Sequence, residues 1–366
     1  MSKILILSND NATIYNFRRE LLKRLIDDKY TVVISVPDHE RNKEFEEMGC
    51  TVEPTVLSRT GTNPINEVKL IGTYKKLIKK TNPDVVLTYT AKPNIYGSLA
   101  CKSLGAPYIN NITGLGAVFQ SENIIKKIML LLQKKAYKKS SCVFFQNKSN
   151  MSYFSDEKIV TKNAKLIPGS GVNLELHCFE EYPDDSSKIK IAFVSRIRKD
   201  KGFDELFEAI KELNKKHSNV EFHLVGWFED DNYKAKIEEI TTKYPVIYHG
   251  VKQPDEVHQI IKNCHGLIHP SHHEGLSNVL LEASATGRAC LASNIAGCME
   301  TIDDDETGFL FEVKNSTSLV NAVEKFLNLT SAQRKEMGVR GRAKMEKTFD
   351  RNFVVQAYID EIEKIC

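Results

Sequence analysis

Two acidic residues, Glu274 and Glu282, are the side chains in this sequence that are best placed for chemistry. They lie eight positions apart, and a glycine follows the first of them. The stretch between them is predicted to be a loop and the first turns of a helix. The apolar run Gly266–Pro270 before it is typical of a buried parallel strand. A helix that begins after such a strand points free backbone N–H groups at an anion.

Two carboxylates beside an anion site suit a ligand that carries both phosphates and sugar hydroxyls, such as a nucleotide sugar. Glu282 would lie roughly one to two turns into the helix, near the face that carries Glu274. Ser277 or Asn278 could cap the helix. The alternative is an ordinary solvated helix start, where the helix dipole favours acidic residues. The acid pair alone leaves both interpretations open.

A second stretch, Ser195–Gly202, also follows a predicted strand and opens a helix. Its Arg196 and Lys201 could both face a diphosphate, because arginine offers a planar fork of donors and lysine a compact charge. A solvated basic loop is the alternative. Two further predicted strands end at Gly226 and Gly250, and glycine at a strand end lets the backbone approach a ligand closely.

The composition is that of an ordinary globular protein. The chain has 366 residues, enough for two domains, with 41% hydrophobic and 27% charged residues. Its net charge of +3 does not by itself argue for nucleic acid. The eight cysteines include no Cys-x-x-Cys pair, which argues against a zinc ribbon and suits reduced thiols in a cytosol. The N-terminal run is interpreted as a first strand, and no apolar run approaches the ~20 residues that span a bilayer.

Strand-like and helix-like stretches alternate along the whole chain. Nearly continuous apolar strands between amphipathic helices predict parallel sheets covered on both faces. The scheme repeats after a polar join at 182–187, so the predicted fold class is α/β, with two Rossmann-like doubly wound domains facing a central cleft. We predict a first domain over 1–180, a second over 188–348, and a C-terminal helix in 349–366 that packs back on the first. The predicted strands are 3–8, 31–36, 51–54, 85–88, 108–111 and 142–146, then 189–195, 221–225, 246–249, 266–268, 289–292 and 308–311.

Taken together, these motifs resemble the retaining glycosyltransferases of family 4, which have the two-domain GT-B fold. The resemblance covers nearly the whole chain; the ordered set of motifs is specific, although each piece alone is weak. It rests on Ser195-Arg196 with Lys201-Gly202, His249-Gly250, Ser271 through Glu282, Ala296 through Glu300, Thr307 through Leu310, and Gly169 through Asn173.

By this resemblance, the second domain would bind a nucleotide-sugar donor whose nucleotide is UDP. Arg196 and Lys201 would neutralise the diphosphate, Glu282 would bind the ribose hydroxyls, and Glu274 would contact the donor sugar. The other donor contacts would be backbone groups: those of Gly275, Leu276, Ser277 and Asn278 for the sugar and phosphates, and those of His249, Gly250 and Val251 for the base.

Fixed cations and helix N–H groups would stabilise the negative charge that develops on a leaving nucleoside diphosphate. That task requires no metal, and no Asp-x-Asp lies beside a strand end, so we expect no metal cofactor. His269, His272 and His273 are spaced too loosely, and lack a Cys or Asp partner, to favour a metal site. His272 or His273 would instead be a loop residue near the sugar.

In the first domain, the resemblance implies that strand ends contact the acceptor. Lys92–Gly97 and Ile112–Gly116 resemble the subgroup that builds capsule, O-antigen and bacterial N-glycan precursors on polyprenyl diphosphate. Many family members carry a histidine near the end of this strand, where this chain has Ala91 and Lys92. An acceptor contact and a plain surface lysine both remain open for Lys92. The acceptor candidates are Asn9, Lys92, Thr113, Gly114 and Gly116.

The segment Ile124–Lys139 is basic and amphipathic. Its six lysines lie beside Ile, Met and Leu, a pattern that can bind an anionic membrane surface. The alternative is a core helix with a snorkelling lysine edge. A polyprenyl diphosphate acceptor favours the membrane interpretation. The residues expected at the membrane are Lys126, Lys127, Lys134 and Lys135, with Ile125, Met129 and Leu132 in the headgroup layer.

The resulting prediction is a retaining glycosyltransferase that moves an N-acetylhexosamine or hexose from a UDP-sugar to a polyprenyl-diphosphate-linked saccharide. It would serve bacterial surface-glycan or N-glycan precursor assembly. It would work in the cytoplasm, peripherally on the inner face of the cytoplasmic membrane. The alternatives are a nucleotide-sugar epimerase or hydrolase of the same fold, and a non-catalytic nucleotide-sugar-binding subunit.

Overall fold

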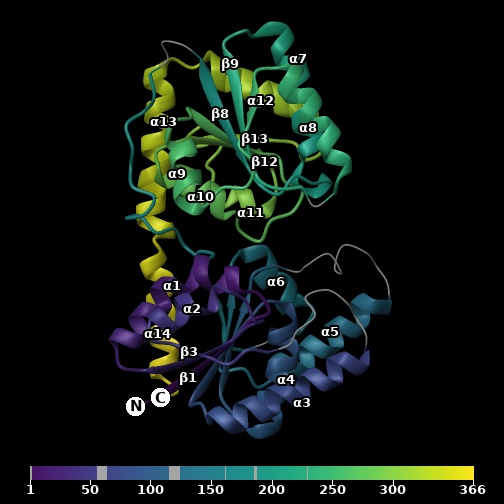
Figure 1. Cartoon of the computed structure of the whole chain (residues 1–366), viewed down its shortest axis with the longest axis vertical. Helices are drawn as coiled ribbons and strands as arrows, with labels where there is room; N and C mark the ends of the chain where they lie inside the picture. The colour runs from purple at the N-terminus through teal and green to yellow at the C-terminus, as the bar shows by residue number, and fades with distance from the viewer. Residues whose placement is uncertain (1, 56–63, 115–123, 161, 185–187, 229) are drawn as a thin grey trace. The chain divides into compact units, whose positions relative to one another are not determined.

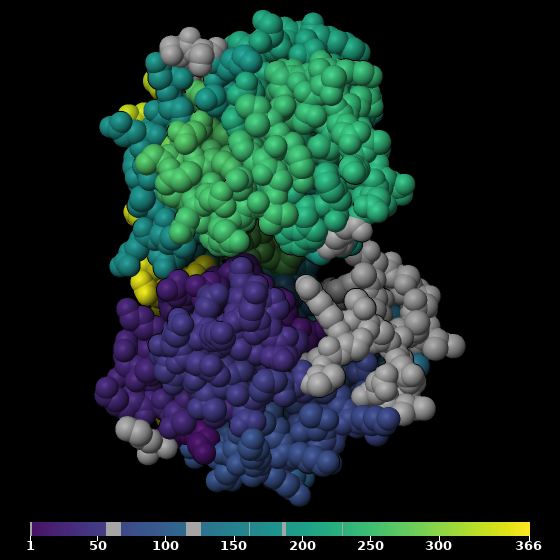
Figure 2. Space-filling view, in the orientation of Figure 1, coloured from purple at the N-terminus to yellow at the C-terminus, as the bar shows by residue number. Residues whose placement is uncertain are grey.

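A computed structural model of the chain describes residues 2–55, 64–114, 124–160, 162–184, 188–228 and 230–366. They form two compact units, one of Met1–Ser170 with Arg351–Cys366 and the other of Gly171–Asp350. In each unit, helices cover both faces of a parallel sheet (Figure 1). Figure 2 shows the surface in the same orientation, with the second unit mainly teal to green. The predicted α/β fold class with two doubly wound, Rossmann-like domains is confirmed.

The first unit is built on a sheet with the strand order β3-β2-β1-β4-β5-β6-β7. Its five inner strands are almost entirely buried because helices cover both faces, whereas the short edge strands β3 and β7 are more exposed. Alternate side chains enter different core clusters, Ile4 and Ile6 on one face and Leu5 and Leu7 on the other. The strands are β1 (Lys3–Leu7), β2 (Thr31–Ser35), β3 (Thr51–Val52), β4 (Val85–Tyr89), β5 (Tyr108–Ile112), β6 (Cys142–Phe145) and β7 (Ala164–Leu166).

Helices alternate with these strands. Asp10 caps the first helix, because its carboxylate accepts a hydrogen bond from the backbone N–H of Thr13 at 3.1 Å. The helices are α1 (Asn11–Asp27), α2 (Asn42–Glu47), α3 (Pro64–Thr81), a π-helical turn (Pro93–Gly97), α4 (Ser98–Leu104), α5 (Ile124–Tyr137), α6 (Lys148–Asp156) and α14 (Arg351–Glu363).

The C-terminal helix α14 belongs to the first unit. Its Tyr358 is buried against Phe144, with ring centroids 4.6 Å apart. Arg351 donates to the carboxylate of Glu20 at 2.9 Å. The chain therefore returns to the first unit at its C-terminus, as the sequence analysis expected.

The second unit has the strand order β10-β9-β8-β11-β12-β13. This is the Rossmann order, which reverses between the two central strands, here β8 and β11. Ligands of such sheets bind at this switch point, outside the carboxyl ends of the strands. The strands are β8 (Ile189–Val194), β9 (Val220–Val225), β10 (Val246–Tyr248), β11 (Gly266–His269), β12 (Ala289–Ser293) and β13 (Gly308–Phe311).

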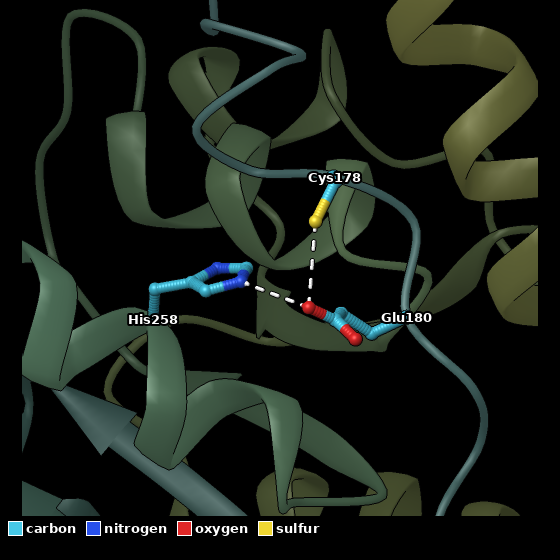
Figure 3. Close-up of side chains that lie close together, drawn as sticks. All are labelled: Cys178, Glu180 and His258. Carbon is cyan, nitrogen blue, oxygen red and sulfur yellow. Dashed lines mark hydrogen bonds and ion pairs between the residues drawn. The ribbon is translucent and has the colours of Figure 1, made fainter.

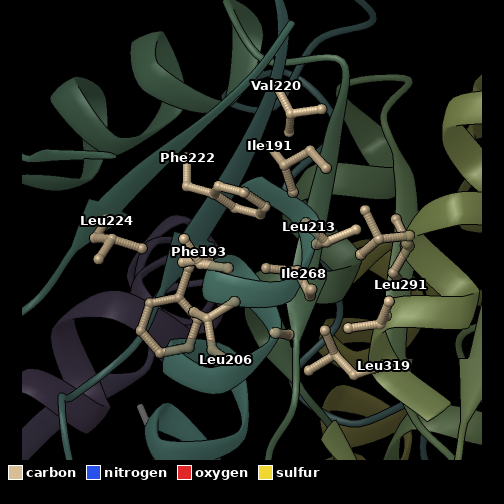
Figure 4. Close-up of a cluster of buried hydrophobic side chains, with 14 of the residues drawn as sticks. Ile191, Phe193, Leu206, Leu213, Val220, Phe222, Leu224, Ile268, Leu291 and Leu319 are labelled. Carbon is tan, nitrogen blue, oxygen red and sulfur yellow. The ribbon is translucent and has the colours of Figure 1, made fainter. Parts of the chain in front are cut away.

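A large hydrophobic cluster covers one face of this sheet (Figure 4). Phe193 and Phe222, from neighbouring strands, pack there with Leu206, Leu213 and Leu319 from two helices. The cluster fixes the β8 strand and the helix that follows it. The helices are a 3-10 turn (Lys199–Lys201), α7 (Phe203–Lys216), α8 (Asn232–Lys243), α9 (Pro254–Lys262), α10 (Asn278–Ala285), α11 (Ala296–Met299), α12 (Ser316–Asn328), α13 (Ser331–Lys344) and a π-helical turn (Met345–Phe349).

The units divide earlier in the chain than the predicted boundary at 180. The segment 171–180 belongs to the second unit because backbone hydrogen bonds tie it there. The N–H of Val172 donates to the carbonyl of Phe349 at 2.8 Å, and that of Glu180 to the carbonyl of Thr286 at 3.2 Å. The predicted strands agree with the structure to within two residues at their ends, but β7, α11 and α13 were not predicted. Among the described helices, none is long and apolar enough to cross a membrane.

Candidate active site

The loop after β8 and the loop after β11 meet at the switch point of the second sheet. Gly202 has a left-handed backbone (φ 71°), and a Cβ there would lie 2.0 Å from the carbonyl oxygen of Pro270. The N–H of His272 donates to the carbonyl of Asp200 at 2.9 Å. Only glycine fits this contact, so the predicted basic loop is held directly against the loop that carries Glu274.

Glu274 lies at the centre of a compact polar cluster. Its Oε1 accepts from Nζ of Lys201 at 2.6 Å and from Nε2 of His269 at 3.0 Å. The side chains of Lys201 and Glu274 are 13% and 15% exposed, so the ion pair is largely shielded from water. Burial alone would raise the pKa of Glu274, but the hydrogen bond from His269 and the charges of His269 and Lys201 lower it to about 2. Glu274 is therefore ionised at neutral pH.

Close backbone packing on the other side fixes the position of Glu274. A Cβ on Gly297, in α11, would lie 2.6 Å from the carbonyl oxygen of Glu274. Glycine at this position lets the short helix α11 rest against the Glu274 backbone. Gly297 belongs to one of the motifs on which the family resemblance rests. Its role in this structure is to let α11 pack against the backbone of Glu274.

Ser277 occupies the N-cap position of α10 but does not cap it. Its backbone is extended (φ −84°, ψ 108°) and no side-chain hydrogen bond closes the first turn. Its Oγ instead lies 3.1 Å from Nε2 of His269. Oδ1 of Asn278 is buried and has no hydrogen-bond partner among the described residues. Neither side chain caps the helix, which leaves its amide groups available to a ligand.

The other predicted donor residues lie on the same loops and helix. Arg196 follows β8 and is half-buried, Gly275 follows Glu274, and Leu276 is buried in a core cluster. Glu282 lies in α10 and is also half-buried. The fold therefore assembles the predicted diphosphate and sugar residues at one switch point.

His249, Gly250 and Val251 lie beyond β10, at the adjacent strand end. Nε2 of His249 lies 3.0 Å from Nδ1 of His223, whose Nε2 lies 3.0 Å from Oε1 of Glu221. Burial lowers the pKa of both histidines, so both are neutral near pH 7. Glu221 can only accept, so His223 donates to it and accepts from His249. This relay leaves Nδ1 of His249 as a hydrogen-bond acceptor.

His272 lies in the loop after β11, and its ring is held by the protein. It is buried, and its Nε2 lies 3.0 Å from Oε1 of Glu205 in α7. His273 is exposed. The contacts of His269 and His223 were not predicted: His269 contacts Glu274 and Ser277 in the loop that follows its strand, and His223 bridges Glu221 on its own strand and His249 after the next one. A histidine at the last position of a strand before an acidic loop is the signal that could have indicated His269.

In the first unit, the predicted acceptor residues also follow strand ends. The N–H of Asn9 donates to Oγ1 of Thr90 at 3.4 Å. Lys92 is paired with Glu67 of α3 at 2.7 Å, with side chains 17% and 11% exposed, so it is not a plain surface lysine. Thr113 and Gly114 are exposed after β5, and the predicted Gly116 lies outside the described residues.

The predicted membrane helix is present as α5, but a different apolar edge is exposed. Lys127, Lys134 and Lys135 are exposed and Lys126 is half-buried. Ile128 and Leu131 are 51% and 62% exposed. The predicted Met129 and Leu132 are half-buried instead, and the side chain of Ile125 is not among those that the structure describes. The exposed apolar residues are therefore Ile128 and Leu131, each one position before a predicted residue.

Comparisons with known proteins identify the family. The model described as "Glycosyl transferase 4-like" matches residues 3–147, and the model described as "Glycosyl transferases group 1" matches residues 178–344. The two together cover most of both units. The chain belongs to this family of glycosyltransferases, and the enzyme is a glycosyltransferase with the GT-B fold.

Relatives resemble the chain over most or nearly all of its length. It is 26% identical to the N,N'-diacetylbacillosaminyl-diphospho-undecaprenol alpha-1,3-N-acetylgalactosaminyltransferase of Campylobacter jejuni, with 99% of each chain covered. It is 25% identical to the capsular polysaccharide glycosyltransferase CapM of Staphylococcus aureus, over 79% of this chain and 80% of the relative. The solved structure of HepE from Anabaena, in complex with UDP and glucose, matches with a TM-score of 0.81 and 17% identity over 100% of both chains.

Proposed function

We propose that the enzyme moves an N-acetylhexosamine or hexose from a UDP-sugar to a polyprenyl-diphosphate-linked saccharide, with retention of configuration. The cluster of Lys201, His269 and Glu274 at the switch point carries the proposal, because it places a cation and an ionised carboxylate beside an uncapped helix start. The names of the Campylobacter relative and of the E. coli UDP-Gal:alpha-D-GlcNAc-diphosphoundecaprenol alpha-1,3-galactosyltransferase support the donor and acceptor classes.

In the proposed reaction, the bond between the sugar C1 and the diphosphate oxygen breaks, and the acceptor hydroxyl oxygen bonds to C1. The electron pair of the broken bond stays on the diphosphate oxygen, so negative charge accumulates on UDP, and the proton of the acceptor hydroxyl is released to solvent. Lys201 and Arg196 would stabilise that charge, together with N–H groups at the start of α10. Glu274, ionised and fixed by His269, would accept hydrogen bonds from hydroxyl groups of the donor sugar.

The proposed reaction uses these protein cations in place of a metal. We therefore expect turnover to persist after treatment with EDTA. A loss of activity that Mg²⁺ or Mn²⁺ restores would contradict this part of the proposal.

The enzyme is also proposed to work at the cytoplasmic membrane surface. Exposed lysines and the exposed Ile128 and Leu131 lie on one short helix, α5, which suits binding to an anionic lipid surface. Such binding would bring the enzyme to an acceptor that is itself anchored in the bilayer.

The test measures UDP release from a panel of UDP-sugars, with and without a synthetic polyprenyl-diphosphate-linked monosaccharide. The proposal expects release that depends on the acceptor, and a product whose anomeric configuration by NMR is that of the donor. Equal release without acceptor would indicate a hydrolase, and binding without release a non-catalytic subunit. A β-linked product from an α-donor would overturn retention.

A further inference from the structure

Three side chains that commonly bind metals meet in the second unit, outside the residues assigned to the donor. Cys178 and Glu180 lie in the irregular segment before β8, and His258 lies in α9 (Figure 3). Sγ of Cys178 and Nε2 of His258 each lie 3.4 Å from Oε1 of Glu180. One ligand atom from each residue lies within 4.8 Å of the other two. The three ligand atoms are therefore close enough together to contact one ion.

We propose that Cys178, Glu180 and His258 bind a borderline-soft divalent cation such as Zn²⁺. A tetrahedral zinc ion with bonds of about 2.0–2.3 Å holds its ligand atoms roughly 3.3–3.7 Å apart. The distances from Oε1 of Glu180 to the thiol and to the imidazole fall in this range. Thiolate, imidazole and carboxylate together are a typical ligand set for this ion. Cys178 is exposed, so water can fill the fourth position.

The fold holds these ligands in place without a metal. Lys262 pairs with Oε2 of Glu180 at 2.8 Å, which leaves Oε1 facing the thiol and the imidazole. Arg288 donates to the backbone carbonyl of Glu180 at 3.1 Å. The ring of His177 packs edge-on against that of His258, with centroids 5.5 Å apart. Binding therefore requires little reorganisation of the protein.

Binding would displace protons. Burial and the Glu180 carboxylate raise the pKa of the Cys178 thiol, so the thiol is protonated at neutral pH and must release its proton to solvent when it binds the ion. Nε2 of His258 must present its lone pair, so its proton moves to Nδ1. That nitrogen is buried and has no partner among the described residues. The missing partner and the Lys262 charge should make the ion exchangeable.

The bound ion would cross-link an irregular segment to a helix of the same unit. Its expected effect is on the stability of the second unit, and not on sugar transfer, because no donor residue takes part. Metal binding and sugar transfer can therefore be tested independently, because a negative result for one leaves the other unchanged.

The experiment titrates the purified enzyme with Co²⁺, a spectroscopic substitute for Zn²⁺. We expect a thiolate-to-cobalt charge-transfer band in the near ultraviolet that Zn²⁺ abolishes by competition. The band should be lost in Cys178→Ser and kept in Cys366→Ser. Cys366 is the other exposed cysteine, and the remaining six are buried. Absence of the band in the parent protein, or its loss only in Cys366→Ser, would overturn the proposal.

Two further variants test the geometry. Glu180→Gln removes an anionic ligand and should weaken Co²⁺ binding by at least about tenfold. Lys262→Gln removes the competing ammonium and should strengthen binding. Unchanged affinity in both variants would show that a surface thiol alone captures the ion, and would refute the three-residue site. Circular dichroism checks that each variant is folded.

Discussion

The ammonium group of Lys201 lies 2.6 Å from Oε1 of Glu274, the same oxygen that Nε2 of His269 approaches to 3.0 Å. Two donors therefore hold one carboxylate oxygen in a largely buried position. This arrangement fixes both the cation and the anion before a donor arrives, which is the preorganisation that transition-state stabilisation requires. A donor diphosphate would therefore contact a Lys201 side chain that is already paired with Glu274.

Lys201→Ala should lower turnover by about a hundredfold, or ~3 kcal/mol, because a charge-assisted contact to the leaving diphosphate is lost. Arg196→Ala should have an effect of the same kind. The matched control is Lys199→Ala, which removes an exposed lysine from the same 3-10 turn. Steady-state kinetics with a saturating donor measures the effect. Equal activity of the Lys201 and Lys199 variants would remove Lys201 from the site.

The ionised state of Glu274 should stabilise the fold in a pH-dependent way. Its folded pKa of about 2 lies below the ordinary value of 4.5, so its contribution is fully present above about pH 4.5 and is lost as pH falls toward 2. That difference corresponds to about 3 kcal/mol. We expect the parent protein to resist urea better than Glu274→Gln at about pH 6 and the gap to narrow by about pH 3. A constant gap would contradict the assignment.

The two acidic residues of the motif should separate kinetically. Glu282→Ala should mainly raise KM for the donor, because contacts to the ribose persist from the ground state to the transition state. Glu274→Ala should mainly lower kcat, because that residue would contact the reacting sugar. Glu336→Ala, which removes an exposed acidic residue, is the control. Equal changes in kcat and KM for both variants would argue against the two roles.

The contact between the two site loops can be tested through Gly202. Gly202→Ala should abolish activity or unfold the second unit, because its Cβ would lie 2.0 Å from a backbone oxygen. Gly105→Ala is the matched control, since Gly105 has a nearly identical φ of 74° and nothing within 4 Å of its Cβ. The control carries only the backbone strain, about 1 kcal/mol. Similar losses in both variants would show that packing at Pro270 is unimportant.

Much of this fold could be predicted from the sequence because buried parallel strands are nearly continuous apolar runs. Strands such as Val85–Tyr89 stand out by composition alone. The short strand β7 was not predicted because only one of its three residues is even partly buried. The boundary was predicted at 180 and not after Ser170 because the sequence at 182–187 is polar, whereas the segment before it is tied to the second unit by long-range backbone hydrogen bonds that no local pattern encodes.

The roles of the predicted site residues stay predictions, but their placement at strand ends follows from the sequence, whereas the contacts between them do not. Glu274, Lys201 and Arg196 follow strand ends, so topology brings their loops together. The pairing of Glu274 with Lys201 joins residues 73 positions apart, and no local pattern encodes it. Cys178, Glu180 and His258 form a cluster for the same reason, with a gap of 78 positions between the last two.

The exposed edge of α5 gives the final prediction. Replacing four lysines of this helix with glutamine should release the enzyme from anionic vesicles, since each lysine near the surface contributes about 1 kcal/mol. The four are Lys126, Lys127, Lys134 and Lys135. Binding of the parent protein should weaken at high salt, because surface charges are screened beyond ~10 Å at moderate ionic strength.

A matched control removes the same charge from exposed positions elsewhere, at Lys76, Lys79, Lys335 and Lys347. A second variant, Ile128→Ser with Leu131→Ser, keeps every charge but removes the exposed apolar edge, and it should also weaken binding, with less dependence on salt. Transfer to a soluble short-chain acceptor should survive in all three variants. Vesicle sedimentation measures binding. If the α5 lysine variant sediments as well as the control does, α5 is only a lysine-edged helix of the first unit, and membrane contact lies elsewhere.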